Sequence, residues 1–209
     1  MSEEDPQPTR RRQADRSAAT RAQLIAAARG LFAERGYAAV GTEEIVRAAG
    51  VTRGALYHHF AGKEALFAAV YEQIETELTE GMAAEAFAAL QNGGPWAAIE
   101  VGSNLFLDAS TDPEVQRIVL LDAPAVLGWE AWREVAEQHG LGLTETVLQA
   151  AMDAGEIDPL PLRPLALVLM ATIDELALYL ARAPDPVEAR AQAGEIVRRV
   201  LGGLRERKG

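Results

Sequence analysis

The residues best suited to chemistry gather between positions 41 and 66, and they suit contact with a nucleic acid. Arg53 stands at the start of a short expected helix, where its guanidinium can donate two hydrogen bonds to a guanine edge. Gly54 and Ala55 are small enough to let that helix approach the floor of a groove or a thymine methyl group. The candidate DNA contacts in this segment are Thr42, Thr52, Arg53, Gly54, Ala55, Tyr57, His58 and Lys63.

Phosphate groups are a second target for these side chains. The two threonines, Tyr57 and His58 carry hydroxyl or imidazole donors for phosphate oxygens. Lys63 begins the next expected helix, where unpaired backbone amides already favour an anion. Tyr57 could instead be a half-buried core aromatic, and that alternative stays open. His58 and His59 are adjacent and diverge by about 100° around a helix, so they do not chelate together and no metal is expected.

Two short helices joined by a tight turn are expected to position these residues. Thr42 is suited to cap the first helix, which Gly50 ends, and Thr52 is suited to cap the second, which runs through His59. This is the helix-turn-helix plan over about residues 41–60, whose turn favours a glycine. The apolar residues expected to bury its inner side are Ile45, Val46, Ala49, Val51, Leu56 and Phe60, with Leu24, Ala28, Leu31 and Phe32 from a helix over 20–35.

The distribution of charge agrees with a nucleic-acid partner. The net charge of the 209-residue chain is −11, which alone argues against a polyanion. Residues 10–63, however, hold ten Lys and Arg against four Asp and Glu, whereas residues 71–209 hold ten against twenty-three. A basic N-terminal third on an acidic body suggests one face made for a polyanion, although chance clustering is an alternative.

The composition and the N-terminal residues limit the classes of protein to which the chain can belong. There is no cysteine, which excludes disulfide frameworks and thiolate chemistry. No signal peptide is recognised, and the apolar run 165–173 is far shorter than the ~20 residues of a membrane span, so a soluble cytoplasmic protein is expected. Residues 1–17 are polar and aperiodic and are expected to be a disordered arm. The arm could reach DNA through Arg10, Arg11, Arg12 and Arg16 or be a solvated tail.

Helix caps and breaks mark the rest of the chain. An apolar stripe predicts a helix from Lys63 to about Gly81, and Pro95 starts another after a glycine pair. Asp112 and Asp185 each precede a proline, as an N-cap residue does. No alternating run indicates a strand, so the expected fold is all-α with about nine helices.

The segment 18–78 resembles the DNA-binding domain of the tetracycline-repressor (TetR) family of bacterial regulators. The resemblance is carried by LFAERGY at the end of helix 20–35, by GT at 41–42, by AAGVTRGALYHHF and by GKEAL at 62–66. Gly62 stands where a typical member has a serine, and glycine is also an acceptable N-cap. The family pattern implies DNA contacts by Thr42, Arg53, Gly54, Tyr57, His58 and Lys63. It also implies that residues 79–209 form a helical effector-binding and dimerisation domain.

That second domain is expected to hold a ligand and a partner subunit. Its candidate ligand contacts are Trp96, Asn104, Phe106, Asp122, Trp129, Trp132 and Tyr179, and the effector is expected to be small and apolar or amphipathic. The resemblance implies a homodimer through apolar helices expected at 162–182 and 186–205, with ordinary tertiary core as the alternative.

These observations predict a ligand-released repressor that binds a palindromic DNA operator as a dimer. An enzyme is disfavoured, because the chain has three histidines, no cysteine, no G-x-S-x-G motif and no phosphate-binding glycine loop. No cofactor is expected. A helical ligand-binding protein that has lost DNA binding is a third reading, and the presence of Arg53, Tyr57 and Lys63 argues against it.

Overall fold

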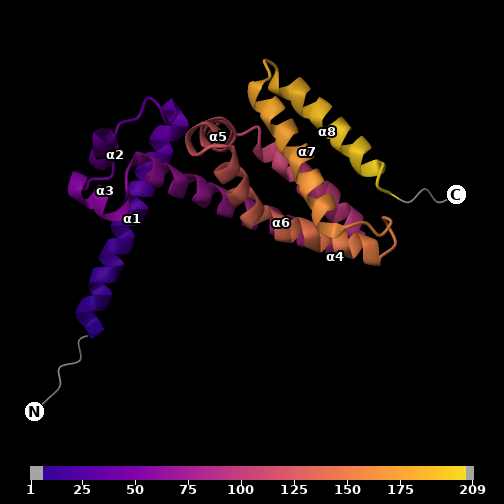
Figure 1. Ribbon diagram of the computed structural model, residues 1–209, viewed down its shortest axis with the longest axis horizontal. Helices are drawn as coiled ribbons and strands as arrows, with labels where there is room; N and C mark the ends of the chain where they lie inside the picture. The colour runs from indigo at the N-terminus through magenta and orange to yellow at the C-terminus, as the bar shows by residue number, and fades with distance from the viewer. Residues whose placement is uncertain (1–6, 206–209) are drawn as a thin grey trace, which may run out of the picture. The chain divides into compact units, whose positions relative to one another are not determined.

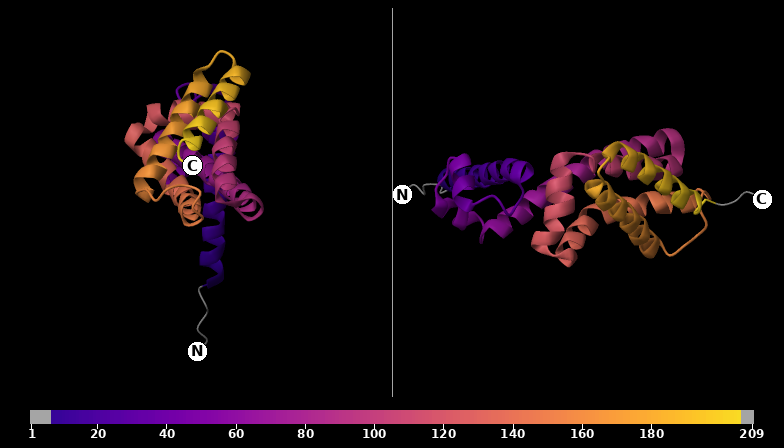
Figure 2. Two further views of the ribbon diagram at one scale, coloured as in Figure 1. Left: turned by 90° about the vertical axis from the view of Figure 1, so that its right-hand side faces the viewer. Right: turned by 90° about the horizontal axis from the view of Figure 1, so that it is seen from above.

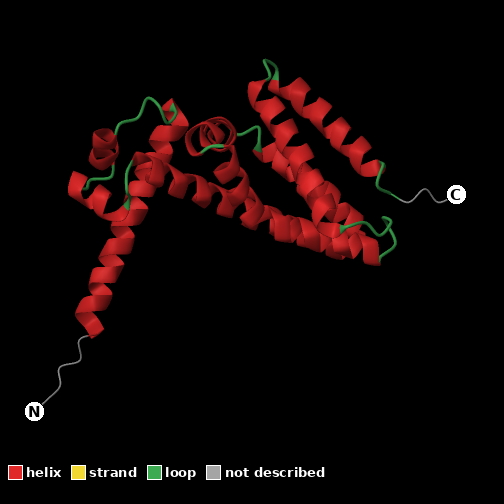
Figure 3. Ribbon diagram, in the orientation of Figure 1, coloured by secondary structure: helices red, strands yellow, loops and turns green. Residues whose placement is uncertain are grey.

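The computed structural model describes residues 7–205, which are helical apart from turns and one isolated β-bridge between Ile157 and Arg205. Eight α-helices and one π-helix follow one another in this part of the chain (Figures 1 and 3). They are α1 (Gln7–Arg35), α2 (Thr42–Ala48), α3 (Arg53–His59), α4 (Lys63–Ala109), the π-helix η1 (Val115–Asp122), α5 (Ala123–Leu127), α6 (Trp129–Asp153), α7 (Leu162–Arg182) and α8 (Pro186–Gly202). The prediction of an all-α fold is confirmed for these residues.

The chain divides into two compact units, residues 1–71 and 72–209. Helix α4 contributes to both, because it begins at Lys63 and continues to Ala109. The sequence places the boundary between residues 78 and 79, about two helical turns later. An uninterrupted helix carries no local signal of the point at which its neighbours change, so the sequence could not locate that boundary.

Helix α1 is longer than predicted. The sequence predicts a disordered arm over residues 1–17, but α1 begins at Gln7 and continues into the expected helix 20–35. The segment is rich in Arg, Gln and Ala, which have high helix propensity, and Pro8 stands in the first turn, where its missing N–H costs little. The backbone of the arginines at 10–12 and 16 is therefore helical, and residues 1–6 lie outside the described residues.

One small core holds the first unit together. Its most buried members are Leu24, Ala28, Phe32, Ile45, Leu56, Leu66 and Phe67. Most of these are the residues that the 3.6-residue periodicity assigns to the inner faces of the helices. The turn between α2 and α3 passes through Gly50, whose φ of +66° is a left-handed conformation that glycine adopts without strain. The core thus fixes α3 against α1 and α2.

Helix α4 is broken within the second unit. Gly94 has φ +84°, and Pro95 follows it, so the helix stops and restarts at this point. The backbone N–H of Trp96 donates to Glu156 Oε2 at 2.8 Å, which gives the restarted helix a carboxylate at its positive end. Trp96 itself is 7% exposed and belongs to the core of this unit.

Helices α6, α7 and α8 pack in sequence order, and α7 and α8 run side by side in every view (Figures 1 and 2). The carboxylate of Asp112 accepts the N–H of Glu114 at 2.8 Å, just before η1. That of Asp185 accepts the N–H groups of Val187 and Glu188 at 3.0 Å, at the start of α8. Both predicted N-cap aspartates are thereby confirmed, and the caps set where the C-terminal helices begin.

Candidate nucleic-acid interface and ligand cavity

Helix α3 turns a polar face to solvent and an apolar face to the core. Leu56 is fully buried, which leaves Arg53, Tyr57 and His58 exposed on the opposite side. Tyr57 is 48% exposed, so it is a surface residue and the alternative of a core aromatic does not hold. His59 is partly buried, in keeping with the expectation that only one of the two histidines faces outward.

The N-terminus of α3 is held by its own cap. The Thr52 hydroxyl accepts the backbone N–H of Ala55 at 3.2 Å, so Thr52 is the predicted N-cap. Arg53 lies 3.5 Å from Glu43 and 5.6 Å from the centre of the Tyr57 ring, with a side chain 62% exposed. Both contacts are weak at such exposure, so the guanidinium can exchange them for a base or a phosphate.

Thr42 has a different place from the one predicted. It is the first residue of α2, and Gly41 is the N-cap, with no side-chain cap hydrogen bond. Glycine is itself an acceptable N-cap, and Glu43 and Glu44 supply negative charge in the first turn. Thr42 therefore remains a candidate DNA contact but does not cap the helix.

Lys63 lies at the start of α4 and is tied to the loop that joins α1 to α2. Its ammonium donates to the carbonyl oxygens of Tyr37 and Val40, both at 2.9 Å. The same ammonium lies 3.9 Å from the centre of the Tyr37 ring, a short cation–π contact. Desolvation by burial, followed by the charge of Glu64, raises the pKa of Tyr37, so the ring stays neutral beneath the cation.

An ion pair also connects the end of α1 to α2. Arg35 forms an ion pair with Glu44 and donates to the carbonyl of Ala39 at 3.0 Å. Together with Lys63, it fixes the loop that carries α2 and α3. Sequence reasoning missed Tyr37 and Arg35 as partners, because a loop carbonyl and a long-range ion pair leave no periodic signal.

The second unit encloses a cavity of about 120 Å³ between α4, η1, α6 and α7. Its walls are mainly apolar and aromatic, and five side chains with hydroxyl or carboxylate groups also line it. The lining residues are Glu75, Thr79, Met82, Ala86, Ala98, Ile99, Gly102, Ser103, Phe106, Val119, Trp132, Ala136, Gly140, Leu143, Thr144, Val147, Leu169, Met170, Ile173 and Asp174. An apolar cavity with a few polar groups is the usual form of a small-molecule site.

Of the predicted ligand contacts, Phe106 and Trp132 line this cavity. The indole N–H of Trp132 donates to the carbonyl of Val119 at 2.9 Å, which fixes the ring in the wall. Trp129 packs against Trp132 with 4.8 Å between ring centres, but it is 51% exposed and lines a separate cleft along α6. Neither Trp96, which lies beneath Arg205, nor Asp122, at the end of η1, lines the cavity.

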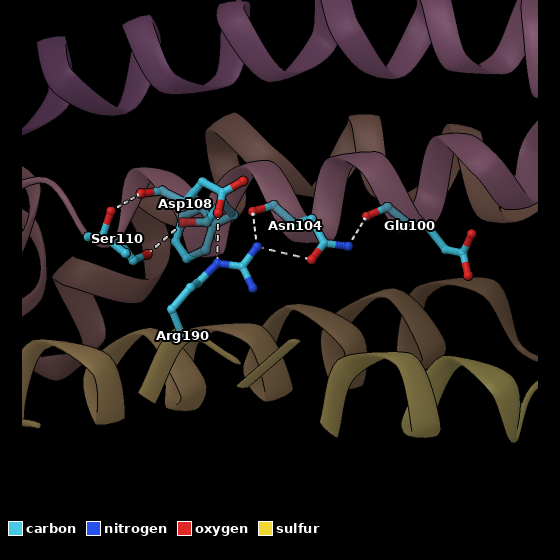
Figure 4. A network of polar contacts seen from close by, with 7 residues as sticks. Glu100, Asn104, Asp108, Ser110 and Arg190 are labelled. Atoms are coloured by element: carbon cyan, nitrogen blue, oxygen red, sulfur yellow. Dashed lines mark hydrogen bonds and ion pairs between the residues drawn. The ribbon is translucent and has the colours of Figure 1, made fainter. Parts of the chain in front are cut away.

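Asn104 is engaged in a polar network that joins α4 to α8 (Figure 4). Arg190 Nε donates to Asp108 Oδ1 at 2.7 Å, and its Nη2 donates to Asn104 Oδ1 at 3.1 Å. Tyr179 lies outside the cavity as well, where its hydroxyl donates to Gln192 at 2.5 Å. These residues fasten α8 to its neighbours.

Two acidic residues in the cavity wall were not predicted. Glu75 is 6% exposed, and Asp174 is partly buried on α7. Desolvation by burial raises the pKa of Asp174 to about 6; the charge of Arg133 lowers it and that of Glu137 raises it. The spacing of Glu75, Thr79 and Met82 on one helical face is the signal that could have found this wall.

Sequence comparison supports both units. The profile described as "Bacterial regulatory proteins, tetR family" matches residues 24–70, and the profile "Tetracyclin repressor-like, C-terminal domain" matches residues 96–204. The chain belongs to the TetR family of transcriptional regulators. Its first unit is the family's DNA-binding helix-turn-helix domain, and the resemblance to the TetR family is confirmed.

Relatives extend the match over nearly the whole chain. The Transposon Tn10 TetC protein of Escherichia coli is 25% identical over 194 residues, which is 88% of this chain and 91% of that protein. A TetR-family transcriptional regulator from Pectobacterium atrosepticum is 31% identical with a TM-score of 0.80, covering 92% of this chain and 97% of that one. RolR, solved in complex with resorcinol, shares the fold at a TM-score of 0.69 and 18% identity, covering 90% of this chain and 94% of that one.

Helix α7 is strongly apolar. It is 21 residues long and contains an 18-residue window with a mean hydropathy of 1.7, so by length and composition alone it could cross a membrane. The apolar run 165–173 is only part of this helix. Core helices of soluble proteins have the same composition, and α7 packs between α6 and α8.

Proposed function

We propose that this TetR-family regulator is a ligand-released repressor that binds a palindromic operator as a homodimer. The observation that carries the proposal is the exposed face of α3, where Arg53, Tyr57 and His58 point away from a helix fixed by a cap and a core. A recognition helix presents such residues to base edges and phosphates in the major groove. The proposed DNA contacts are Thr42, Thr52, Arg53, Gly54, Ala55, Tyr57, His58 and Lys63.

Lys63 has two roles in this proposal. Two of its three ammonium donors face backbone carbonyls, so its first role is to hold the loop after α1 in place. Its second role is to place a positive charge beside the backbone amides at the start of α4, where unpaired N–H groups favour a phosphate oxygen.

The proposed dimer surface lies on the last two helices, which carry the exposed apolar side chains of Val168, Tyr179, Val187, Ile196 and Val200, all at least 42% exposed. Large apolar side chains this exposed are typical of a surface that a partner covers. A second copy of the chain is the proposed partner, because a two-fold dimer matches a palindromic site.

The proposed effector site is the cavity, with Phe106 and Trp132 as ligand contacts. RolR, of the same fold, was solved with the small molecule resorcinol, which supports a ligand site in this architecture. Ligand binding would favour a dimer whose recognition helices no longer match two half-sites about 34–36 Å apart. The proposal places the protein in the cytoplasm with the DNA, and includes no enzymatic activity, metal or cofactor.

Selection of bound duplexes from a random pool tests the DNA-binding proposal, with purified protein at a fixed salt concentration. The proposal expects an enriched palindrome whose base preference relaxes in Arg53→Ala, since arginine reads base edges. Arg47→Ala is a suitable control because Arg47 is exposed on α2 and not among the proposed contacts. Enrichment of the same site by wild type and Arg53→Ala would show that α3 does not read the sequence.

A further inference from the structure

We propose that the cavity of the second unit takes a cationic amphipathic effector, an apolar body about the size of one aromatic ring that carries an amine. The inference rests on the proposed function, because it names the chemical class of the effector for the same cavity. It starts from the charges in the wall. Glu75 and Asp174 bring two carboxylates, and none of the lining residues is a lysine, arginine or histidine.

The neutral polar groups of the wall are acceptors too. The hydroxyls of Ser103 and Thr144 donate to carbonyls one turn earlier on their own helices, at 2.8 and 3.0 Å. The indole N–H of Trp132 is used by the carbonyl of Val119. A hydroxyl has one proton, so what Ser103 and Thr144 can still offer to a ligand is lone pairs. Thr79 adds one further hydroxyl, so the wall offers mainly acceptors, and a ligand that donates hydrogen bonds matches it best.

The remaining wall suits a compact apolar body with a positive end. Phe106 and Trp132 supply aromatic rings, and Met82 and Met170 supply polarisable thioethers. A cavity of about 120 Å³ is comparable with the engineered cavity of about 150 Å³ that accepts benzene. A neutral apolar ligand would cover the Asp174 carboxylate without replacing its lost hydration, and an anion would be repelled by the negative charges of the wall.

The environment of Asp174 favours a cationic ligand beside it. Burial raises its pKa to about 6, and the charge of Arg133 does not offset that rise. A carboxylate in this position gains from a positive ligand beside it, because an opposite charge favours the ionised form. Glu137 also faces this group, and its charge adds to the negative field.

Three probes of one size test the inference: 2-phenylethylamine, which is a cation at neutral pH, 2-phenylethanol, which is neutral, and phenylacetate, which is an anion. Calorimetry without DNA measures the affinity of each for the wild-type chain. The amine is expected to bind at least about tenfold more tightly than the other two, the usual gain of a hydrogen bond to a charged group. Asp174→Asn is expected to lower the amine's affinity about tenfold and to leave the alcohol's affinity unchanged.

Glu175→Gln is the matched control, since it removes an exposed carboxylate from the same helix, and it should bind all three probes as the wild type does. Binding of the alcohol or phenylacetate as tight as that of the amine, no binding of the amine, or an amine preference that survives Asp174→Asn overturns the inference. The probe comparison on the wild type stands alone if the variant does not fold. Because DNA is absent, these outcomes are separate from the proposed function, which the duplex selection with wild type and Arg53→Ala tests.

Discussion

Replacing Lys63 with methionine should destabilise the DNA-binding unit, even though Lys63 is a candidate DNA contact. The change keeps the aliphatic stem and removes the ammonium that donates to the carbonyls of Tyr37 and Val40. Each hydrogen bond from a charged donor contributes about 1.5–3 kcal/mol, and the contact with the Tyr37 ring adds about 0.5–1 kcal/mol. Solvent can replace part of this at a half-buried site, so we expect a loss of about 3 kcal/mol in the free energy of unfolding.

Hydrogen exchange of amides in residues 37–60 measures this loss in the right unit, because the three tryptophans lie at 96, 129 and 132 and would report on the other. Arg53→Met is the matched control: its exposed ion pair is worth about 0–1 kcal/mol, so it should leave the exchange nearly unchanged while weakening DNA binding. If Lys63→Met exchanges as slowly as the wild type, the tie between Lys63 and the loop contributes nothing and the reasoning is refuted.

Three further predictions concern the second unit. The pKa of Asp174 is raised to about 6 from 3.8, so the folded state holds this proton more tightly than the unfolded state and loses stability as the pH rises from about 4 to 6. The free energy of unfolding of Asp174→Asn minus that of the wild type should therefore be up to about 3 kcal/mol larger above pH 6 than below pH 4. Urea titrations at the two pH values measure this difference, and the same value at both would contradict the prediction. Glu156→Ala removes the carboxylate that accepts the N–H of Trp96 and should lower the free energy of unfolding by about 1 kcal/mol. Thermal unfolding measures this loss, and an unchanged stability would show that the cap contributes nothing. Val187→Glu puts a charge on the most exposed apolar residue of α8 and should yield a monomer in light scattering, whereas an intact dimer would place the interface elsewhere.

The DNA-facing side of the first unit could be predicted closely from the sequence. Its information is local: a glycine in the turn, a threonine cap and apolar residues at helical spacing on one side of each helix. Those rules leave Arg53, Tyr57 and His58 on the outer face, which is where the structure exposes them. Lys63 was found by the same motif, but its internal partners come from the loop 26 and 23 residues earlier, and no local rule connects them.

The cavity could be predicted only in part. Phe106 and Trp132 were found because large aromatic residues in a helical ligand domain are natural candidates. Glu75 and Asp174 were missed because an acidic residue on a helix is usually solvent-facing, and their burial depends on how four elements pack. Trp96 and Tyr179 were proposed for the same reason as the first two, and Asn104 was proposed as a polar partner. Their packing into the core or onto α8 depends on tertiary contacts.

We propose that one dimer reads two half-sites with two copies of α3, and the spacing of the half-sites is a direct test. The measurement is the affinity of the wild-type protein for the selected duplex and for the same duplex with about five base pairs inserted at its centre, which rotates one half-site to the opposite face. We expect the insertion to reduce the affinity to that of a single half-site. Equal affinity for the two duplexes would contradict it, because each half-site would then be read independently.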